Sequence, residues 1–294
     1  MIVSASYRTD IPAFYGDWFL SRLEAGACDV TNPYGGPAYR VPLVGPEAEG
    51  FVFWTRNIAP FGPALEAVEA RGLPFVVHYT ITGYPRALEA SVIPAARSVA
   101  LVRALAERYG PRTVVWRYDP LLITSLTPPE WHRKTFAGLA AALVGATDEV
   151  VLSFAQVYRK TRTNTERAAR RHGFTWRDPA PAEKRALLAE LAGLARAQGL
   201  KASLCAQPDL LDEGSRGVGL QAARCIDAKR LSEVAGRTIT AKTKGNRPGC
   251  LCAQSRDIGA YDTCPHGCVY CYAVSRPDAA KRRHRAHHPA RLTL

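Results

Sequence analysis

The chain has 294 residues, of which 47% are hydrophobic and 22% are charged, a composition typical of an ordinary globular protein. No stretch approaches the eighteen or so apolar residues of a membrane span. The N-terminal MIVSASYRTD lacks the basic and apolar regions of a secretory signal, so we expect a cytoplasmic protein. In that reducing compartment its eight cysteines favour metal binding or redox chemistry over disulfides.

The net charge of +13 is concentrated in two segments. Residues 159–172 and 276–294 each hold six Lys or Arg and one acidic residue, so each carries +5 and the rest of the chain is close to neutral. Such runs can bind a polyanion, which predicts a nucleic acid as a partner. The alternative is a solvated helix face and a disordered tail that aids solubility.

Six apolar, β-branched and aromatic runs recur along the chain with helical patterns between them. The runs cover residues 2–7, 51–55, 74–82, 113–118, 149–154 and 200–205. They are near-continuous rather than alternating, as in strands that are buried on both faces of a parallel sheet. Proline and glycine punctuate helical segments at residues 63–71, 95–109, 128–144 and 181–198.

This alternation of strands and helices predicts an α/β fold. We expect a (β/α) barrel, full or partial, of about six βα units. A doubly wound open sheet is the competing architecture, because periodicity does not distinguish a closed sheet from an open one. We expect the barrel in residues 1–235, a cysteine-rich iron–sulfur segment over its mouth in residues 236–275, and a basic tail in residues 276–294.

Polar side chains follow each of the six expected strands. The carboxyl ends of barrel strands meet at one rim, where barrel enzymes build their sites. Taken singly, each of these residues can also be a cap or turn residue at a strand end. Together they predict a polar cavity in which the substrate is positioned by Arg8, Asp10, Arg56, Asn57, Tyr79, Arg117, Asp119 and Tyr158.

Three cysteines lie close together in YDTCPHGCVYCYA, residues 261–273, with the spacing C-x3-C-x2-C. The thiolates of Cys264, Cys268 and Cys271 can hold three corners of a cubane cluster, which leaves the fourth iron without a protein ligand. Zinc sites more often use paired C-x2-C knuckles. The spacing therefore favours a [4Fe-4S] cluster over zinc.

Four more cysteines lie between the sixth expected strand and this motif, at Cys205, Cys225, Cys250 and Cys252. Four thiolates can form a closed site, which predicts a second [4Fe-4S] cluster or a zinc ion. Reduced thiols that happen to lie near one another are the alternative. Cys28 is expected to be a buried structural thiol.

The CPHGCVYCYA segment resembles the cluster loop of the radical S-adenosylmethionine enzymes, and is locally closest to the spore photoproduct lyase type. The resemblance implies a cluster on Cys264, Cys268 and Cys271, S-adenosylmethionine on the open iron, and an electron donor such as ferredoxin or flavodoxin. The likeness to a DNA-repair lyase also points to a nucleic-acid substrate. In that superfamily, however, the cysteine loop follows the first strand, whereas here it follows all six.

A second resemblance spans nearly the whole chain. The segments RTDIPAFY, FWTRN, YTITGY, WRYDP and DIGAYDTCPHGCVYCYA resemble a family of prokaryotic proteins catalogued only as a domain of unknown function. The leading hypothesis is an iron–sulfur enzyme that carries out one-electron or radical chemistry on an unidentified substrate. The alternative is a non-catalytic iron–sulfur or zinc protein that acts as a redox or metal sensor or as a nucleic-acid-binding module. A metal-dependent hydrolase is disfavoured because His78 is the only imidazole at the expected rim.

Overall fold

Eight parallel strands form one sheet at the centre of the protein, within the residues that the computed structural model describes, 1–33 and 35–294. The strand order is β11-β10-β8-β6-β5-β4-β1-β12. The strands are β1 (Ile2–Ala5), β4 (Gly50–Thr55), β5 (Phe75–Thr80), β6 (Val114–Leu121), β8 (Glu149–Phe154), β10 (Lys201–Leu204), β11 (Gln221–Ala222) and β12 (Ser255–Asp257).

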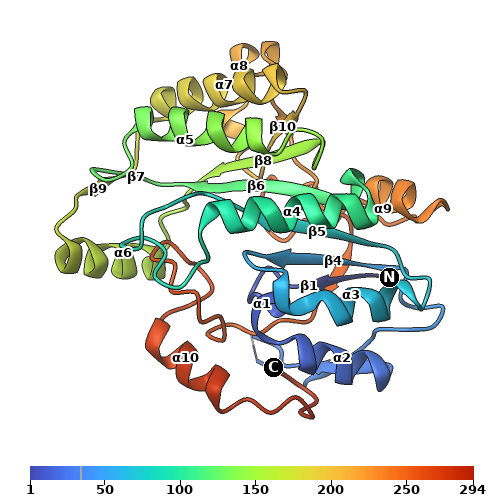
Figure 1. Ribbon diagram of the computed structural model, residues 1–294. Helices are drawn as coiled ribbons and strands as arrows, with labels where there is room; N and C mark the ends of the chain where they lie inside the picture. Colours follow the sequence, from blue (N-terminus) through green and yellow to red (C-terminus); the bar gives the residue numbers. More distant parts are fainter. Residues whose placement is uncertain (34) are drawn as a thin grey trace.

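Helices and two short antiparallel ladders complete the fold (Figure 1). The ladders pair β2 (Ala27–Val30) with β3 (Tyr39–Pro42), and β7 (Ile123–Thr124) with β9 (Trp176–Arg177). The α-helices are α1 (Ile11–Phe14), α2 (Gly16–Glu24), α3 (Gly62–Glu69), α4 (Ala95–Tyr109), α5 (Pro129–Ala142), α6 (Arg159–His172), α7 (Pro181–Ala197), α8 (Glu213–Gly217), α9 (Ala228–Ala235) and α10 (Pro277–Arg285). Single 3-10 turns lie at η1 (Ala59–Phe61), η2 (Pro111–Thr113) and η3 (Pro208–Leu210).

The two faces of the sheet are covered by different parts of the chain. One face packs against α2 to α5 and α7, and its core contains Phe53, Val77 and Trp116. The other face presents Val52 and Val76, which share a smaller core with α9 and the cysteine-bearing segments after it. From β1 to β11 each strand lies beside the one before it in the sheet, and right-handed crossovers then place the connecting helices on one face.

The predicted α/β class is confirmed, and each of the six expected strands is present as β1, β4, β5, β6, β8 and β10. A closed barrel is not found, because β11 and β12 are the two edges of the sheet and do not pair with each other in the described part of the chain. From β1 to β11 the strands are added in one direction only, without the reversal of order that defines a doubly wound sheet. Only the last strand, β12, is added on the other side of β1.

The C-terminal part of the chain is built into the fold. β12, from the expected cysteine-rich segment, pairs in parallel with β1. The basic tail forms α10, and its backbone continues back to α2, where Trp18 donates its indole N–H to the carbonyl of Arg291 at 2.9 Å. None of the described helices has the length and apolar character to cross a membrane.

Candidate metal and substrate site

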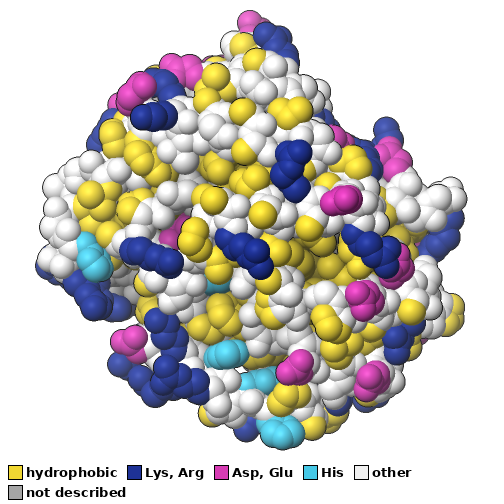
Figure 2. Space-filling view, in the orientation of Figure 1, with side chains coloured by type: hydrophobic (Ala, Val, Ile, Leu, Met, Phe, Trp, Pro, Cys, Tyr) yellow, Lys and Arg dark blue, Asp and Glu magenta, His cyan; other side chains and the backbone are white. Residues whose placement is uncertain are grey.

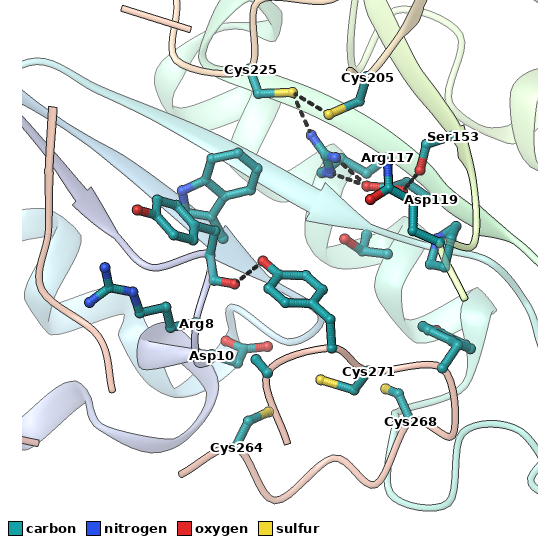
Figure 3. Close-up of a pocket in the computed structure, with 18 of the residues that line it drawn as sticks. Arg8, Asp10, Arg117, Asp119, Ser153, Cys205, Cys225, Cys264, Cys268 and Cys271 are labelled. Carbon is teal, nitrogen blue, oxygen red and sulfur yellow. Dashed lines mark hydrogen bonds and ion pairs between the residues drawn. The ribbon is translucent and has the colours of Figure 1, made fainter. Parts of the chain in front are cut away.

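A cavity of about 290 Å³ lies at the carboxyl ends of the parallel strands, at the small end of the range for ligand sites. It collects side chains at or just after the carboxyl ends of the strands from β1 to β11, together with residues of the segment 246–252. The loop of residues 261–273, which we call the cysteine loop, supplies the rest. The predicted residues that line it are Arg8, Asp10, Arg56, Arg117, Asp119, Tyr158 and seven cysteines, Cys205, Cys225, Cys250, Cys252, Cys264, Cys268 and Cys271. Figure 3 shows the last three on one side, and Cys205 and Cys225 on the other.

Two predicted residues do not line the cavity. Tyr79 is fully buried in the core on the helix-covered face of the sheet, because its neighbour His78 takes the opposite side of β5. Asn57 accepts a hydrogen bond from the backbone N–H of Ala59 at 3.1 Å, so its side chain closes the turn that precedes α3. A positioning role for these two side chains therefore has no geometric support.

The cysteine loop is held from two sides. Backbone hydrogen bonds join it to residues 88–91, which lie between β5 and α4. On the other side, Thr161, Asn164 and Thr165 occupy one face of α6 at helical spacing. Thr161 and Thr165 donate side-chain hydrogen bonds to carbonyl oxygens of the loop, and Asn164 donates to the carbonyl of Val274, directly after it. The polar face of this basic helix is thus what positions the loop, and its arginines are left outside.

A buried ionic network lies under the cysteine loop. The Glu89 carboxylate accepts hydrogen bonds from the Arg56 guanidinium at 2.7 Å, from the Thr82 hydroxyl at 2.7 Å and from the Tyr270 hydroxyl. Arg56 and Glu89 have side chains only 11% and 4% exposed. A charge pair at this depth is tolerated because each partner satisfies the other. The network therefore fixes Tyr270, which directly precedes Cys271.

Asp10 joins the first strand end to the same loop. Its carboxylate caps α1 at Ala13, accepts the backbone N–H of Arg56 at 2.8 Å, and accepts a hydrogen bond from Nε2 of His266 at 2.7 Å. His266 lies between Cys264 and Cys268 in the sequence and is 3% exposed. Asp10 is thus a positioning residue whose two oxygens tie three segments together.

Arg117 and Asp119 form the polar side of the cavity beneath Cys225. The guanidinium donates to Asp119 through Nε at 3.0 Å and to the Cys225 sulfur through Nη1 at 3.1 Å. Burial by itself would raise the pKa of Asp119, but the guanidinium and a hydrogen bond from Ser153 lower it overall. Asp119 is therefore ionised at neutral pH and holds Arg117 against the thiol.

Burial controls the ionisation of the triad thiols. It raises the pKa of Cys264 and Cys271, and it raises the pKa of Cys268 to about 12 although Arg56 acts in the opposite direction. A metal that binds there must displace the thiol protons. The described ranges contain no three His, Cys, Asp or Glu side chains placed to hold one single metal ion. A four-iron cluster does not require the three sulfurs to surround one ion, because each thiolate binds a different iron. The three thiols facing one cavity therefore fit that group.

The family model described as "Domain of unknown function (DUF1848)" matches residues 2–273. The chain belongs to this family. The DUF1848 match spans the sheet, the cavity and both cysteine sets, and it ends before α10. No curated protein and no solved structure matches the chain.

Two residues of this DUF1848 chain that sequence reasoning missed are central to the site. Glu89 lies in a loop without any motif, and only the fold brings it beneath Arg56. Asp257, on β12, accepts hydrogen bonds from Ser4 and Ser6 and lies 3.7 Å from Nε of Arg8. A three-residue strand with two charged residues has no hydrophobic pattern to reveal it. An acidic residue just before the cysteine motif was the signal available.

Proposed function

We propose that this protein is an iron–sulfur enzyme in which Cys264, Cys268 and Cys271 hold a [4Fe-4S] cluster at the cavity. The observation that carries the proposal is that all three thiols line the same cavity as the Arg117–Asp119 pair. A cluster on three thiolates keeps one iron open to a small ligand and supplies one electron at a time. The resemblance of the loop adds S-adenosylmethionine as that ligand and a ferredoxin or flavodoxin as the electron donor.

The placement of the site supports an enzyme. We infer that the sheet is a partial (β/α) barrel, because its strands follow one another from β1 to β11 in the barrel order, and barrel enzymes work at the carboxyl ends of their strands. Arg8, whose guanidinium lies against the rings of Tyr7 and Tyr261, is available to grip an anionic group of a ligand. Tyr158 is 44% exposed and lines the cavity at its entrance.

Anaerobic purification and a count of iron and sulfide per chain test the proposal. The triad predicts about four iron atoms and four sulfides that disappear in a Cys268→Ala variant. A Cys28→Ala variant is the matched control, because Cys28 is buried in the helix-packed core and lies outside the cavity. Reduction in the presence of S-adenosylmethionine should then release 5′-deoxyadenosine. An unchanged iron content in Cys268→Ala would refute the ligand set, and iron without 5′-deoxyadenosine would refute the radical reaction.

A second candidate is a non-catalytic redox or metal sensor that binds nucleic acid. The observation that favours it is that α6 and α10, more than a hundred residues apart in sequence, both lie against the cysteine loop. Lys160 of α6 is 3.9 Å from Asp262, and Arg283 of α10 donates to the carbonyl of Tyr261. Figure 2 shows Lys and Arg side chains gathered over these two helices. Phosphates of a single strand can follow such a surface.

Binding of a labelled single-stranded oligonucleotide, measured by fluorescence anisotropy at several salt concentrations, tests this surface. The variant replaces four arginines with Gln. All four are exposed and have no ion pair within the described part of the chain: Arg170, Arg171, Arg282 and Arg285. Loss of four phosphate contacts should make the slope of log K against log salt shallower by about 3. The control changes Arg71 and Lys201 to Gln; Arg71 lies just before β5 and Lys201 begins β10, both at the amino ends of strands and away from the cavity. Equal loss in both variants, or no binding by the wild type, rejects the nucleic-acid partner.

A further inference from the structure

We propose that Cys205, Cys225, Cys250 and Cys252 form a second metal site, a four-thiolate centre for zinc or an iron–sulfur cluster. In the described residues no three of these side chains are yet placed to hold a single ion, so the proposal is that a bound metal draws the four thiols together. The site lies across the cavity from the cysteine loop and goes beyond the proposed function, which needs only the triad. Its four thiols come from three separate segments of the chain, after β10, after β11 and before β12.

The four thiols follow one another as neighbours in the order Cys205, Cys225, Cys252 and Cys250. The sulfurs of Cys205 and Cys225 are 3.5 Å apart, and the Cys252 thiol interacts with those of Cys225 and Cys250. Metal–sulfur bonds of about 2.3 Å in a tetrahedron put neighbouring sulfurs about 3.8 Å apart. The Cys205–Cys225 separation is therefore close to one edge of such a tetrahedron, and the series closes if its two half-buried ends, Cys205 and Cys250, approach each other.

Two guanidinium groups point at the adjacent thiols of Cys205 and Cys225. Arg117 donates to the Cys225 sulfur at 3.1 Å, and Arg247 donates to the Cys205 sulfur at 3.5 Å. Four thiolates with a dipositive metal or cluster core carry a net charge of −2, which two arginines beside the sulfurs can offset. Asp119 takes up part of the Arg117 charge, so Arg247 is the less compensated of the two. Positive donors of this kind are of little use to neutral thiols and stabilise thiolates.

Backbone N–H groups serve the other two sulfurs. Ile226 donates its N–H to the Cys252 sulfur at 3.3 Å, and the N–H groups of Asn246 and Cys252 donate to Cys250. The turn that makes this possible is tight, since a Cβ on Gly245 would lie 2.2 Å from the carbonyl oxygen of Cys250. The sulfurs of Cys205, Cys225 and Cys252 thus each receive an N–H hydrogen bond, as metal-bound thiolates do through the groups that surround them.

Competing uses of these thiols fit less well. A single disulfide would use two of the four sulfurs, and it would not account for the N–H groups that donate to the other two. Isolated buried cysteines behave as small apolar side chains, whereas these four gather around one cavity and two of them contact each other and a guanidinium group. By contrast, Cys28 packs among apolar side chains in the main core and takes no part in the cavity. The comparison separates a structural thiol from a ligand set in the same chain.

The test is a metal analysis in a full-length variant that lacks the triad, Cys264→Ala/Cys268→Ala/Cys271→Ala. We expect it to retain either one zinc, or iron with an equal amount of acid-labile sulfide, and both results support the site. Adding Cys225→Ala or Cys252→Ala should remove that metal, while adding Cys28→Ala should not. Absence of zinc and iron in the triad variant after reconstitution with either metal, or retention in the Cys225 and Cys252 variants, overturns the proposal.

A variant outside the ligand set distinguishes loss of metal binding from loss of the fold. Replacing Arg247 with Met leaves all four thiols in place and removes one donor to sulfur, so metal affinity should fall by about 10- to 100-fold in a chelator competition. Circular dichroism should be unchanged. An unaltered affinity would show that the guanidinium does not face a metal-bound thiolate. Because the triad is absent from all these variants, a negative result for the second site does not count against the proposed iron–sulfur enzyme. Equally, loss of the triad iron alone does not count against the second site.

Discussion

Removing the Glu89 carboxylate should be among the most damaging single changes in this protein. In a Glu89→Leu variant the Arg56 guanidinium, only 11% exposed, loses its ion-pair partner at 2.7 Å. An uncompensated buried charge of this kind costs about 3–5 kcal/mol. At about 2 °C per kcal/mol for a chain of this size, the melting temperature should fall by about 6–10 °C.

Urea denaturation of three variants checks the reasoning. Glu89→Leu combined with Arg56→Met removes both charges and should recover most of the lost stability, because a buried pair replaced by apolar groups is often nearly neutral. The control is Glu69→Leu, whose exposed ion pair with Arg108 should contribute less than about 1 kcal/mol. A Glu89→Leu cost below about 1 kcal/mol, or a double variant no more stable than Glu89→Leu itself, would contradict the buried-charge argument.

Two further changes probe the fold around the site. Burial lowers the pKa of His132 to about 4, below its unfolded value of about 6.5. Protonation therefore favours the unfolded chain, and stability that is complete above pH 6.5 is lost as the pH falls. A His132→Gln variant should lose about 2.5 kcal/mol less than the wild type between pH 7 and 4.5 in urea titrations; equal losses would exclude this residue as the cause. In Gly259→Ala the new Cβ would lie 2.0 Å from the Ser6 hydroxyl, so a loss of about 1–3 kcal/mol is expected. Gly138→Ala, in open space on α5, should instead be neutral or stabilising, and urea denaturation of the two glycine variants compares them.

Much of the secondary structure was readable from the residues alone. The apolar runs at 51–55 and 149–154 became β4 and β8 within one residue at each end. Buried parallel strands need uninterrupted apolar side chains, so their signal is strong and local. Proline and glycine likewise marked α4 and α7, because a helix start and a helix end each require their own backbone chemistry. The spacing of the triad was equally local.

The direction of individual side chains was not readable in the same way. A strand buried on both faces has no alternation, so nothing in FVVHYT distinguishes His78, next to the cavity-lining Arg117, from Tyr79, on the far side of the sheet. The sequence is equally ambiguous for Arg56 and Asn57, of which the structure shows that Arg56 lines the cavity and Asn57 closes a turn. Polar residues after strands predicted a site, but the pleat of each strand decided which of them belong to it.

Local spacing was enough to group Cys264, Cys268 and Cys271, because three side chains on one short loop stay close whatever the rest of the chain does. It was not enough to join Cys205, Cys225, Cys250 and Cys252, whose meeting depends on β10 pairing with β11 and on the chain returning to form β12. The position of the two basic helices also depends on the tertiary structure, since α6 and α10 become neighbours only around the folded cysteine loop (Figure 1). Contacts between distant segments follow from sheet pairing and core packing, which involve the whole chain at once.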